Sequence, residues 1–232
     1  MNLSKRLNEV AGFVTKGNSV ADIGTDHGYI PVYLALNGLS PKVIAMDVNE
    51  GPLKRAHANI LKYHVENTVE TRLSDGLDGL VPGEVRTVII AGMGGLLMIR
   101  ILSGNMELVR SLDELILSPH SDIRQVRSFL NDVGMDVCDE KIVKDEGKYY
   151  FVMKINPSAK PEGVMTEFDL RYGKHLLRKR DTVFYEYLHN ELHKKKNILE
   201  RLNGQAVSGS ERIKEISGDI AMIEAGISLY NN

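Results

Sequence analysis

The sequence predicts a doubly wound α/β domain followed by a helical hairpin. In the first half of the chain, short β-branched runs alternate with helical stretches, which is the pattern of a parallel sheet with helices on both faces. Two long strand-like runs then follow with no helix between them, and the last third of the chain reads as helix throughout. These observations predict five parallel strands, a β-hairpin that completes a seven-stranded sheet, and a separate helical module.

Five runs are the candidate parallel strands. Four of them are nearly continuously apolar, as expected of strands buried on both faces, and the third alternates. In chain order they are Ser19–Gly24, Lys42–Val48, Val69–Asp75, Thr87–Met93 and Glu114–His120. The stretch "DVCDEKIVKDEGKYYFVMKINP" has a turn signal, "DEGK", between two strand-like runs and predicts the hairpin. This order of strands resembles that of the class I methyltransferases and differs from the repeated βαβ halves of a dinucleotide-binding fold.

The composition changes at "NPSAKPEG" (156–163), where two prolines and a glycine indicate a linker. We therefore expect a first domain over residues 1–157 and a helical hairpin over residues 158–232. The last helix carries an a/d seam at spacings of 3 and 4, formed by Ile213, Ile216, Ile220, Ile223 and Ile227. An earlier helix supplies the facing residues Leu188, Leu192, Leu199 and Leu202, and "NGQAVSGS" (203–210) is a suitable turn. The seam is short, so a monomer and a homodimer paired through these helices both stay open.

The composition is that of an ordinary globular protein. The chain has 232 residues, of which 43% are hydrophobic and 26% charged, and a net charge of −2, so neither disorder nor a fibrous architecture is indicated. The single Cys138 forbids an internal disulfide and fits a reducing compartment. The N-terminus lacks the apolar region of a secretion signal, and the longest apolar run, Val88–Ile99, is shorter than the roughly 20 residues of a membrane span. We expect a cytoplasmic protein with no membrane partner and, because the histidines lack partners at ligand spacing, no metal site.

The turn after the first strand argues against a phosphate ligand. A dinucleotide-binding turn carries Gly-x-Gly, so that amides at a helix N-terminus hold a pyrophosphate. Here the turn contains Asp22, Gly24, Asp26 and Gly28, and a carboxylate 4 Å from a phosphate would cost about 4 kcal/mol at an effective dielectric near 20. The methionine end of S-adenosylmethionine carries an ammonium and a sulfonium instead. Asp22 can accept from the ammonium, and Gly24 lets the backbone approach the ligand.

Two later acids fit the same cofactor. Asp47 ends the second strand, where an acid commonly accepts the ribose hydroxyls, and Asp75 ends the third strand, where it can accept from the adenine amine. Each acid alone is more readily a helix N-cap or a strand-end turn residue. Three acids at three successive strand ends, where open α/β sheets bind ligands, favour a cofactor site. "AGMGG" (91–95) after the fourth strand either lets the backbone approach a ligand or is a tight turn that needs glycine.

With "DIGTDHGYIP", "SDGL", "IAGMGG" and the helical tail, the sequence resembles the bacterial tRNA (adenine-22 N1)-methyltransferase family over essentially its whole length. The resemblance implies a class I methyltransferase fold, S-adenosylmethionine as the donor, and a helical tail that helps to hold tRNA. It also implies a set of cofactor contacts, namely Asp22, Gly24, Asp47, Asp75, Gly76, Gly92 and Met93. The chain departs from the family at "LSPH" (117–120), where relatives often have "LQPN", so the roles of Ser118 and His120 stay open between site and strand end.

Residues beyond the cofactor turn are candidates for catalysis. Adenine N1 has its own lone pair, so transfer needs no base to create the nucleophile, but positive charge develops on the ring. A carboxylate that accepts from the exocyclic amine would stabilise that charge and later take the proton. Asp26 is our candidate for this role, and His27 and Tyr29 are candidates for contact with a flipped adenine. The alternatives are that Asp26 caps the next helix, that His27 is an ordinary polar residue and that Tyr29 lies in the core.

The charge distribution predicts where RNA would bind. The net charge is slightly acidic, but cationic residues predominate between Arg171 and Arg201. The candidate tRNA contacts are Arg178, Lys179, Arg180, Lys194, Lys195 and Lys196, in two clusters that would lie roughly 22 Å apart along a helix. The alternative is the solvated face of a coiled coil. Two other functions stay open: a methyltransferase of a small molecule or protein whose hairpin serves dimerisation, and a non-catalytic RNA-binding module.

Overall fold

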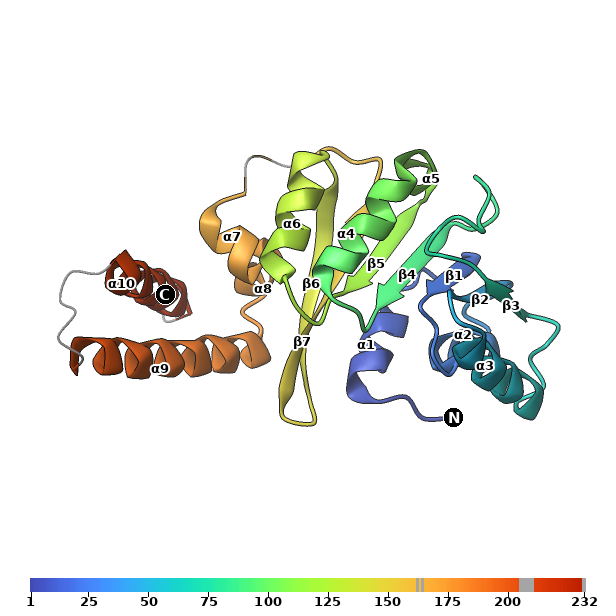
Figure 1. Ribbon diagram of the computed structural model, residues 1–232, viewed down its shortest axis with the longest axis horizontal. Coiled ribbons are helices and arrows are strands. Elements are labelled where there is room, and N and C mark those ends of the chain that lie inside the picture. Colours follow the sequence, from blue (N-terminus) through green and yellow to red (C-terminus); the bar gives the residue numbers. More distant parts are fainter. Residues whose placement is uncertain (162, 164, 205–210, 231–232) are drawn as a thin grey trace. The chain divides into compact units, whose positions relative to one another are not determined.

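The first part of the chain forms one seven-stranded sheet (Figure 1). The computed structural model describes residues 1–161, 163, 165–204 and 211–230. The strands are β1 (Val20–Ile23), β2 (Val43–Asp47), β3 (Val69–Leu73), β4 (Thr87–Ala91), β5 (Glu114–Ser118), β6 (Asp136–Asp145) and β7 (Lys148–Asn156). Their order is β3-β2-β1-β4-β5-β7-β6, with β1 to β5 parallel and β7 antiparallel to both neighbours. The predicted class I methyltransferase fold is confirmed.

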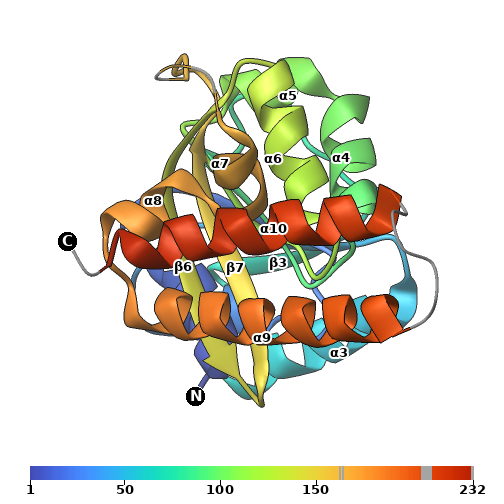
Figure 2. The same cartoon turned by 90° about the vertical axis from the view of Figure 1, so that its left-hand side faces the viewer.

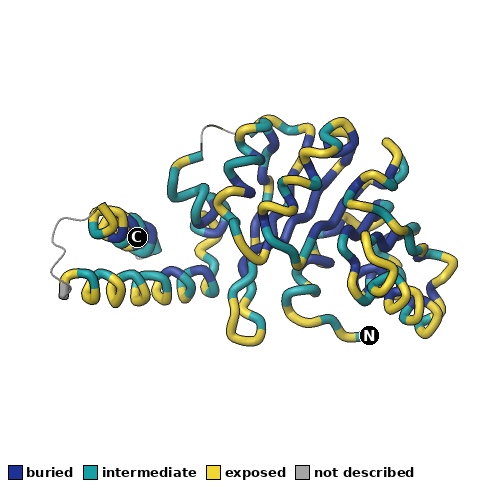
Figure 3. Tube along the Cα trace, viewed as in Figure 1, coloured by how far each residue is buried: buried dark blue, intermediate teal, exposed yellow. Residues whose placement is uncertain are grey.

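Helices cover both faces of the sheet. One face packs against α1 (Lys5–Gly12), α2 (Tyr29–Leu36) and α3 (Glu50–Lys62). The other packs against α4 (Gly95–Gly104), α5 (Met106–Ser111) and α6 (Ile123–Asp132). The central strands are buried along their whole length, because apolar side chains of both faces are covered (Figure 3). β1 and β4 pair in parallel, so their carboxyl ends lie side by side.

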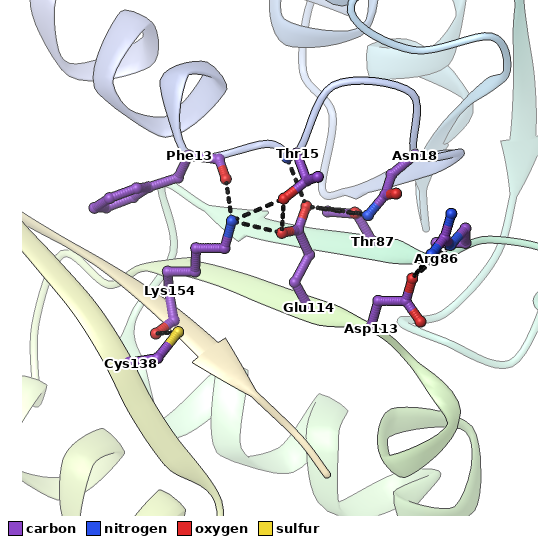
Figure 4. Close-up of polar contacts among 9 residues, drawn as sticks. All are labelled: Phe13, Thr15, Asn18, Arg86, Thr87, Asp113, Glu114, Cys138 and Lys154. Atoms are coloured by element: carbon purple, nitrogen blue, oxygen red, sulfur yellow. Dashed lines mark hydrogen bonds and ion pairs between the residues drawn. The ribbon is translucent and has the colours of Figure 1, made fainter. Parts of the chain in front are cut away.

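A buried carboxylate at the amino end of β5 binds the loop that connects α1 to β1 (Figure 4). Glu114, the first residue of β5, accepts from the Lys154 ammonium at 2.7 Å and from both the amide and the hydroxyl of Thr15, at 2.9 and 2.7 Å. The Thr87 hydroxyl donates to the same carboxylate at 2.7 Å. Burial alone would raise the pKa of Glu114, but these hydrogen bonds outweigh it and the pKa is lowered. Glu114 therefore anchors the chain that leads from α1 into β1.

The hairpin of β6 and β7 extends beyond its neighbour. β7 pairs with β5 only from Met153 to Ile155, so residues 148–151 project past the carboxyl end of β5. The backbone amide of Arg6 in α1 donates to the Asp145 carboxylate at 3.1 Å, and Lys141 pairs with Glu9. These contacts hold the first turn of α1 against the projecting part of the hairpin.

The chain divides into two compact units, Met1–Arg171 and Tyr172–Asn232. This division falls 14 residues after the expected boundary at 157 (171 − 157). The segment in between is bound to α6: Arg124 binds the Glu167 carboxylate through two hydrogen bonds of 2.9 and 2.8 Å. The buried Arg127 side chain donates to the Leu170 and Arg171 carbonyls at 3.2 and 3.0 Å. The start of α7 (Glu167–Tyr172) therefore packs with the sheet unit, a contact that the linker-like composition did not reveal.

The second unit contains α8 (Lys174–Arg178), α9 (Thr182–Gly204) and α10 (Glu211–Ser228). α9 and α10 lie side by side, as Figure 2 shows. The face of α10 toward α9 buries Ile216 and Ile223 as predicted, but also Asp219, whose carboxylate pairs with Lys195 of α9 at 2.6 Å. Of the predicted turn, residues 205–210 lie outside the described part of the chain. Within that part, no helix is both long and apolar enough to cross a membrane.

Candidate functional site

Two adjacent hollows lie at the carboxyl ends of β1, β2 and β4. The first has a volume of about 290 Å³ and the second about 270 Å³. Both are lined by Gly24 after β1 and by Ala91 and Gly92 at the end of β4, so the two hollows meet at these residues. This is the crevice between β1 and β4, where the strand order reverses and where open α/β sheets bind ligands.

The predicted cofactor residues all line these hollows. Asp22 belongs to the first, Gly24 and Gly92 to both, and the second is lined by Asp47, Asp75, Gly76 and Met93. Gly24 has a φ of +76°, and a Cβ there would lie 2.7 Å from the Met93 side chain, so a larger residue would be strained and would displace Met93. The sheet thus brings together four segments that are separate in the sequence.

The second hollow has two acids with different surroundings. One oxygen of Asp47 accepts from the Asn49 amide at 2.8 Å, which fixes the carboxylate at the end of β2. Asp75 is more exposed, and its carboxylate lies 3.9 Å from the Arg100 guanidinium of α4. Sequence reasoning did not identify Arg100, because this α4 residue belongs to none of the motifs and gave no signal. Both acids can accept hydrogen bonds from hydroxyls or amines of a ligand.

Asp22 is the buried acid of the first hollow. Only 6% of the residue is exposed. Burial raises its pKa from 3.8 to about 6, and the negative charge of Asp47 adds to the effect. A carboxylate that is costly to ionise in the free protein would be stabilised by a cation, so the site suits a ligand with a positive charge beside Asp22.

The residues after the turn do not cap α2. The N-cap of α2 is Gly28, which makes no side-chain cap hydrogen bond, so Asp26 does not have the capping role that was the alternative. Asp26 instead pairs with Arg55 of α3, whose Nε donates to Oδ1 at 3.2 Å, and its Oδ2 lies 3.4 Å from Nε2 of His27. Arg55 is a further residue that sequence reasoning missed, because it contacts Asp26 across 29 residues of chain.

His27 and Tyr29 form an aromatic stack at the rim of the first hollow. Their ring centroids are 5.1 Å apart with an interplanar angle of 7°. Tyr29 is 42% exposed, so it is not a core residue, which was the alternative interpretation of its ring. The stack therefore presents an aromatic surface beside Asp26 that a planar ligand can contact.

A third group at the first hollow comes from α1. Arg6 lines the hollow, and its guanidinium lies 5.2 Å from the centre of the Tyr150 ring on the projecting part of β7. The His120 ring is 5.4 Å from that of Tyr150. Burial lowers the pKa of His120, and the positive charges of Arg6 and Lys148 lower it further. His120 is thus at the margin of the site, although it does not line either hollow.

The predicted tRNA contacts lie in the second unit and have different environments. Arg178, Lys179 and Arg180 are exposed, as are Lys194 and Lys196. Lys194 pairs with Glu191 of its own helix and Lys196 with Glu224 of α10, both at 2.8 Å. The side chain of Lys195 is only 23% exposed and is held by Asp219.

The expectation that both basic clusters lie on one helix was wrong. α8 ends at Arg178, Arg180 has a left-handed φ of +51°, and α9 begins only at Thr182. The clusters therefore belong to separate elements, and a spacing calculated along a continuous helix does not apply to them.

This protein has the class I methyltransferase fold. The features that define it are the five parallel strands, the antiparallel hairpin beside β5 and the acid-lined hollows at the carboxyl edge of the sheet. A family model described as a methyltransferase domain matches residues 3–153, and the chain belongs to this methyltransferase family.

Similar proteins match nearly the whole chain. The tRNA (adenine(22)-N(1))-methyltransferase of Bacillus subtilis is 29% identical over 229 residues, which cover 97% of this chain and 96% of the relative. The structure of Streptococcus pneumoniae Sp1610 in complex with S-adenosyl-L-methionine is 29% identical, with a TM-score of 0.86 over 97% of this chain and 100% of that one. The structure of M. capricolum TrmK with S-adenosyl-homocysteine is 26% identical, with a TM-score of 0.85 over 98% and 99%. The resemblance expected from the sequence is confirmed.

Proposed function

We propose that the protein is an S-adenosylmethionine-dependent methyltransferase that modifies N1 of an adenine in tRNA, at position 22. The observation that carries the proposal is the arrangement of buried Asp22, paired Asp26 and the His27–Tyr29 stack around one hollow. Relatives of nearly the same length that carry this activity or bind this cofactor support it.

The lining of the two hollows fits the cofactor. Asp22 would accept from the ammonium of the methionine moiety, since a cation compensates the cost of its buried charge. Asp47 would accept from the ribose hydroxyls, and Asp75 from the adenine amine. Gly24, Gly76 and Gly92 would allow close approach of the backbone, and the Met93 side chain would pack against the ligand between the hollows. When bound, S-adenosylmethionine supplies an electrophilic methyl group.

Residues at the rim of the first hollow would act on the acceptor base. The stacked His27 and Tyr29 rings would position a flipped adenine with its N1 toward the methyl group. Asp26 would accept a hydrogen bond from the exocyclic amine, whose acidity rises as the ring becomes cationic, and would take its proton. Arg55 would hold Asp26 in this orientation through the 3.2 Å hydrogen bond.

The exposed basic residues of the second unit would contact tRNA phosphates. Arg178, Lys179, Arg180, Lys194 and Lys196 form this set, and binding should weaken steeply as salt increases. Lys195, which was also a candidate, is better placed to stabilise the helix pair through Asp219. A tRNA substrate would agree with the cytoplasmic location expected from the sequence, and the tRNA complex could form with a monomer or a homodimer.

The test is methylation of unmodified tRNA with labelled S-adenosylmethionine, followed by nucleoside analysis. We expect label in N1-methyladenosine, and none when guanosine replaces adenosine at position 22 of the transcript. Label in another nucleoside would change the assigned acceptor, and transfer to a small molecule or protein with no label in RNA would refute the proposal. The Asp22→Asn variant is the control for cofactor dependence.

A further inference from the structure

His120 is an exposed residue two positions after the end of β5, and its ring edge lies close to the junction of the two hollows. A Cβ on Gly92 would be 3.9 Å from both Cε1 and Nε2 of this ring, and Gly92 lines both hollows. Because Gly92 has no side chain, a ligand above this glycine can come within reach of the imidazole.

The backbone of His120, and not its ring, holds the loop after β5. The His120 amide donates to the Met93 carbonyl at 2.9 Å, which joins this loop to the turn after β4. The ring packs at a tilt against Tyr150 and makes no hydrogen bond in the part of the chain that the structure describes. An imidazole available to a ligand, on a loop that its own backbone fixes, is typical of a residue that binds substrate.

The charges near the ring favour its neutral form. Arg6 of α1, Lys148 of β7 and the Tyr150 ring are its neighbours. Burial lowers the pKa of His120, and the positive charges of Arg6 and Lys148 lower it further. A neutral imidazole has one nitrogen that accepts a hydrogen bond, so at pH 7 the ring can bind an N–H donor. An RNA phosphate would instead require the protonated ring.

We propose that His120 is a specificity-determining residue that accepts a hydrogen bond from the exocyclic amine of the target adenine. The inference rests on the proposed function and adds a second acceptor to it. Asp26 would approach the amine from the turn after β1, and His120 would approach it from the loop after β5. The amine has two N–H groups, so it can donate to both residues.

Two acceptors at this place select adenine among the purines. Guanine has a carbonyl oxygen where adenine has its amine, and this oxygen would meet two acceptors without a hydrogen to share. Two hydrogen bonds also keep the amine planar, with its lone pair delocalised into the ring. N1 then remains the nucleophile that faces the methyl group.

The experiment compares two tRNA transcripts that differ only in the amine. One has adenosine at position 22 and the other has purine riboside, which keeps N1 and lacks the amine. Methylation by the wild type and by His120→Ala is measured with saturating S-adenosylmethionine. We expect His120→Ala to lower kcat/KM for the adenosine transcript about 3- to 10-fold, the effect of one hydrogen bond, and to leave kcat/KM for the purine transcript unchanged.

Matched variants separate this contact from a structural role. His120→Asn should recover most of the rate on adenosine, because an amide oxygen also accepts a hydrogen bond. His57→Ala removes an exposed histidine of α3, and it should keep the wild-type ratio between the two transcripts. Equal losses on both transcripts in His120→Ala, or a loss of affinity for S-adenosylhomocysteine as large as the loss of rate, would overturn the proposal.

Binding measurements distinguish the failure of this inference from that of the proposed function. The affinity of each transcript is measured for the wild type and His120→Ala with S-adenosylhomocysteine bound. If the wild type methylates the adenosine transcript and His120→Ala leaves the ratio of the transcripts unchanged, the inference is wrong and the proposed function stands. If the wild type methylates neither transcript but prefers to bind adenosine in a manner that His120→Ala abolishes, the contact stands and the proposed activity fails.

Discussion

The Asp26 carboxylate and the Arg55 guanidinium form an ion pair that joins the turn after β1 to the middle of α3, with Nε 3.2 Å from Oδ1. The pair is half-exposed, so it adds little to stability. Its consequence is orientation: Oδ1 is held by Arg55, while Oδ2 remains on the side of His27 and the first hollow. This arrangement suits a carboxylate that must meet a substrate amine at a fixed angle.

Replacement of Asp26 by Asn should greatly reduce turnover without preventing cofactor binding. The amide keeps the shape of the side chain but cannot take a proton from the adenine amine, and general-base contributions are about 10²- to 10⁴-fold. Single-turnover methylation of tRNA and titration of S-adenosylhomocysteine give the two quantities separately. Unchanged turnover would remove Asp26 from the mechanism.

Arg55→Gln should have a smaller effect of the same kind. We expect kcat to fall roughly 10- to 100-fold, because a carboxylate misplaced by about 1 Å loses this order of rate. Arg55→Lys should recover most of the rate, since an ammonium can still pair with Asp26, and neither variant should change the affinity for S-adenosylhomocysteine. A variant at Arg55 that loses cofactor affinity as much as rate would show a structural role instead.

Asp22→Asn should stabilise the free protein at neutral pH while abolishing cofactor binding. The pKa of Asp22 is raised from 3.8 to about 6, so the folded state retains the proton more tightly than the unfolded chain. Protonated Asp22 makes its full contribution to the free energy of unfolding below pH 3.8. This contribution of roughly 2 to 3 kcal/mol is lost as the pH rises through 6. The melting temperature of the ligand-free variant should therefore be higher than that of the wild type at pH 8 and equal to it at pH 4. A wild type that is more stable than the variant at pH 8 would contradict the buried, ligand-free carboxylate.

Cofactor affinity should also depend on the ionisation of Asp22, but it should rise with pH where the stability of the free protein falls. A cationic ammonium binds the ionised form of Asp22, so affinity should be highest above pH 6 and fall as pH decreases through the raised pKa. Calorimetric titration of S-adenosylhomocysteine between pH 5 and 8 measures this dependence. A flat profile would show that the ligand does not contact Asp22 through a charge.

Glu114→Gln should destabilise the sheet unit by about 2 to 4 kcal/mol at pH 7, because Lys154 loses its carboxylate partner while several hydrogen bonds are weakened. The lowered pKa of Glu114 gives stability that is present above pH 4.5 and is lost as pH falls through the folded-state pKa. The difference between wild type and variant should therefore shrink in acid. Asp113→Asn is the matched control: its exposed pair with Arg86, drawn in Figure 4, should contribute less than about 1 kcal/mol.

Substitutions of Lys194 and Lys195 should have different effects, one on RNA binding and the other on stability. Lys195→Gln removes the cation of the pair with buried Asp219 and should lower the melting temperature of the helical unit. Lys194→Gln leaves that pair intact and should instead weaken tRNA binding. The slope of log affinity against log salt should become shallower by the amount expected for about one phosphate contact. A fall in melting temperature for Lys194→Gln, with unchanged RNA affinity, would contradict this division.

The residue pattern alone predicted the order of the strands along the chain, the acid-bearing turn and the a/d seam of the last helix. These features are local: hydrophobic periodicity records which faces are buried, and a strand end followed by Asp and Gly marks its place at the carboxyl edge. Such local signals pointed to the three acids at the strand ends, and the family resemblance implied the full set of seven candidate cofactor residues, which line the two hollows. The sequence also favoured a tRNA methyltransferase, because several motifs and the helical tail agreed.

The side chains from distant segments that meet at the site could be identified only from the folded chain. Arg6 reaches the first hollow from a helix that precedes every motif, and Arg55 meets Asp26 across 29 residues of chain. Lys195 resembles its neighbours in sequence, yet the packing of α9 against α10 pairs it with Asp219. Periodicity cannot predict such pairs, because side-chain charges are matched by the geometry of packed elements and not by their spacing along the chain.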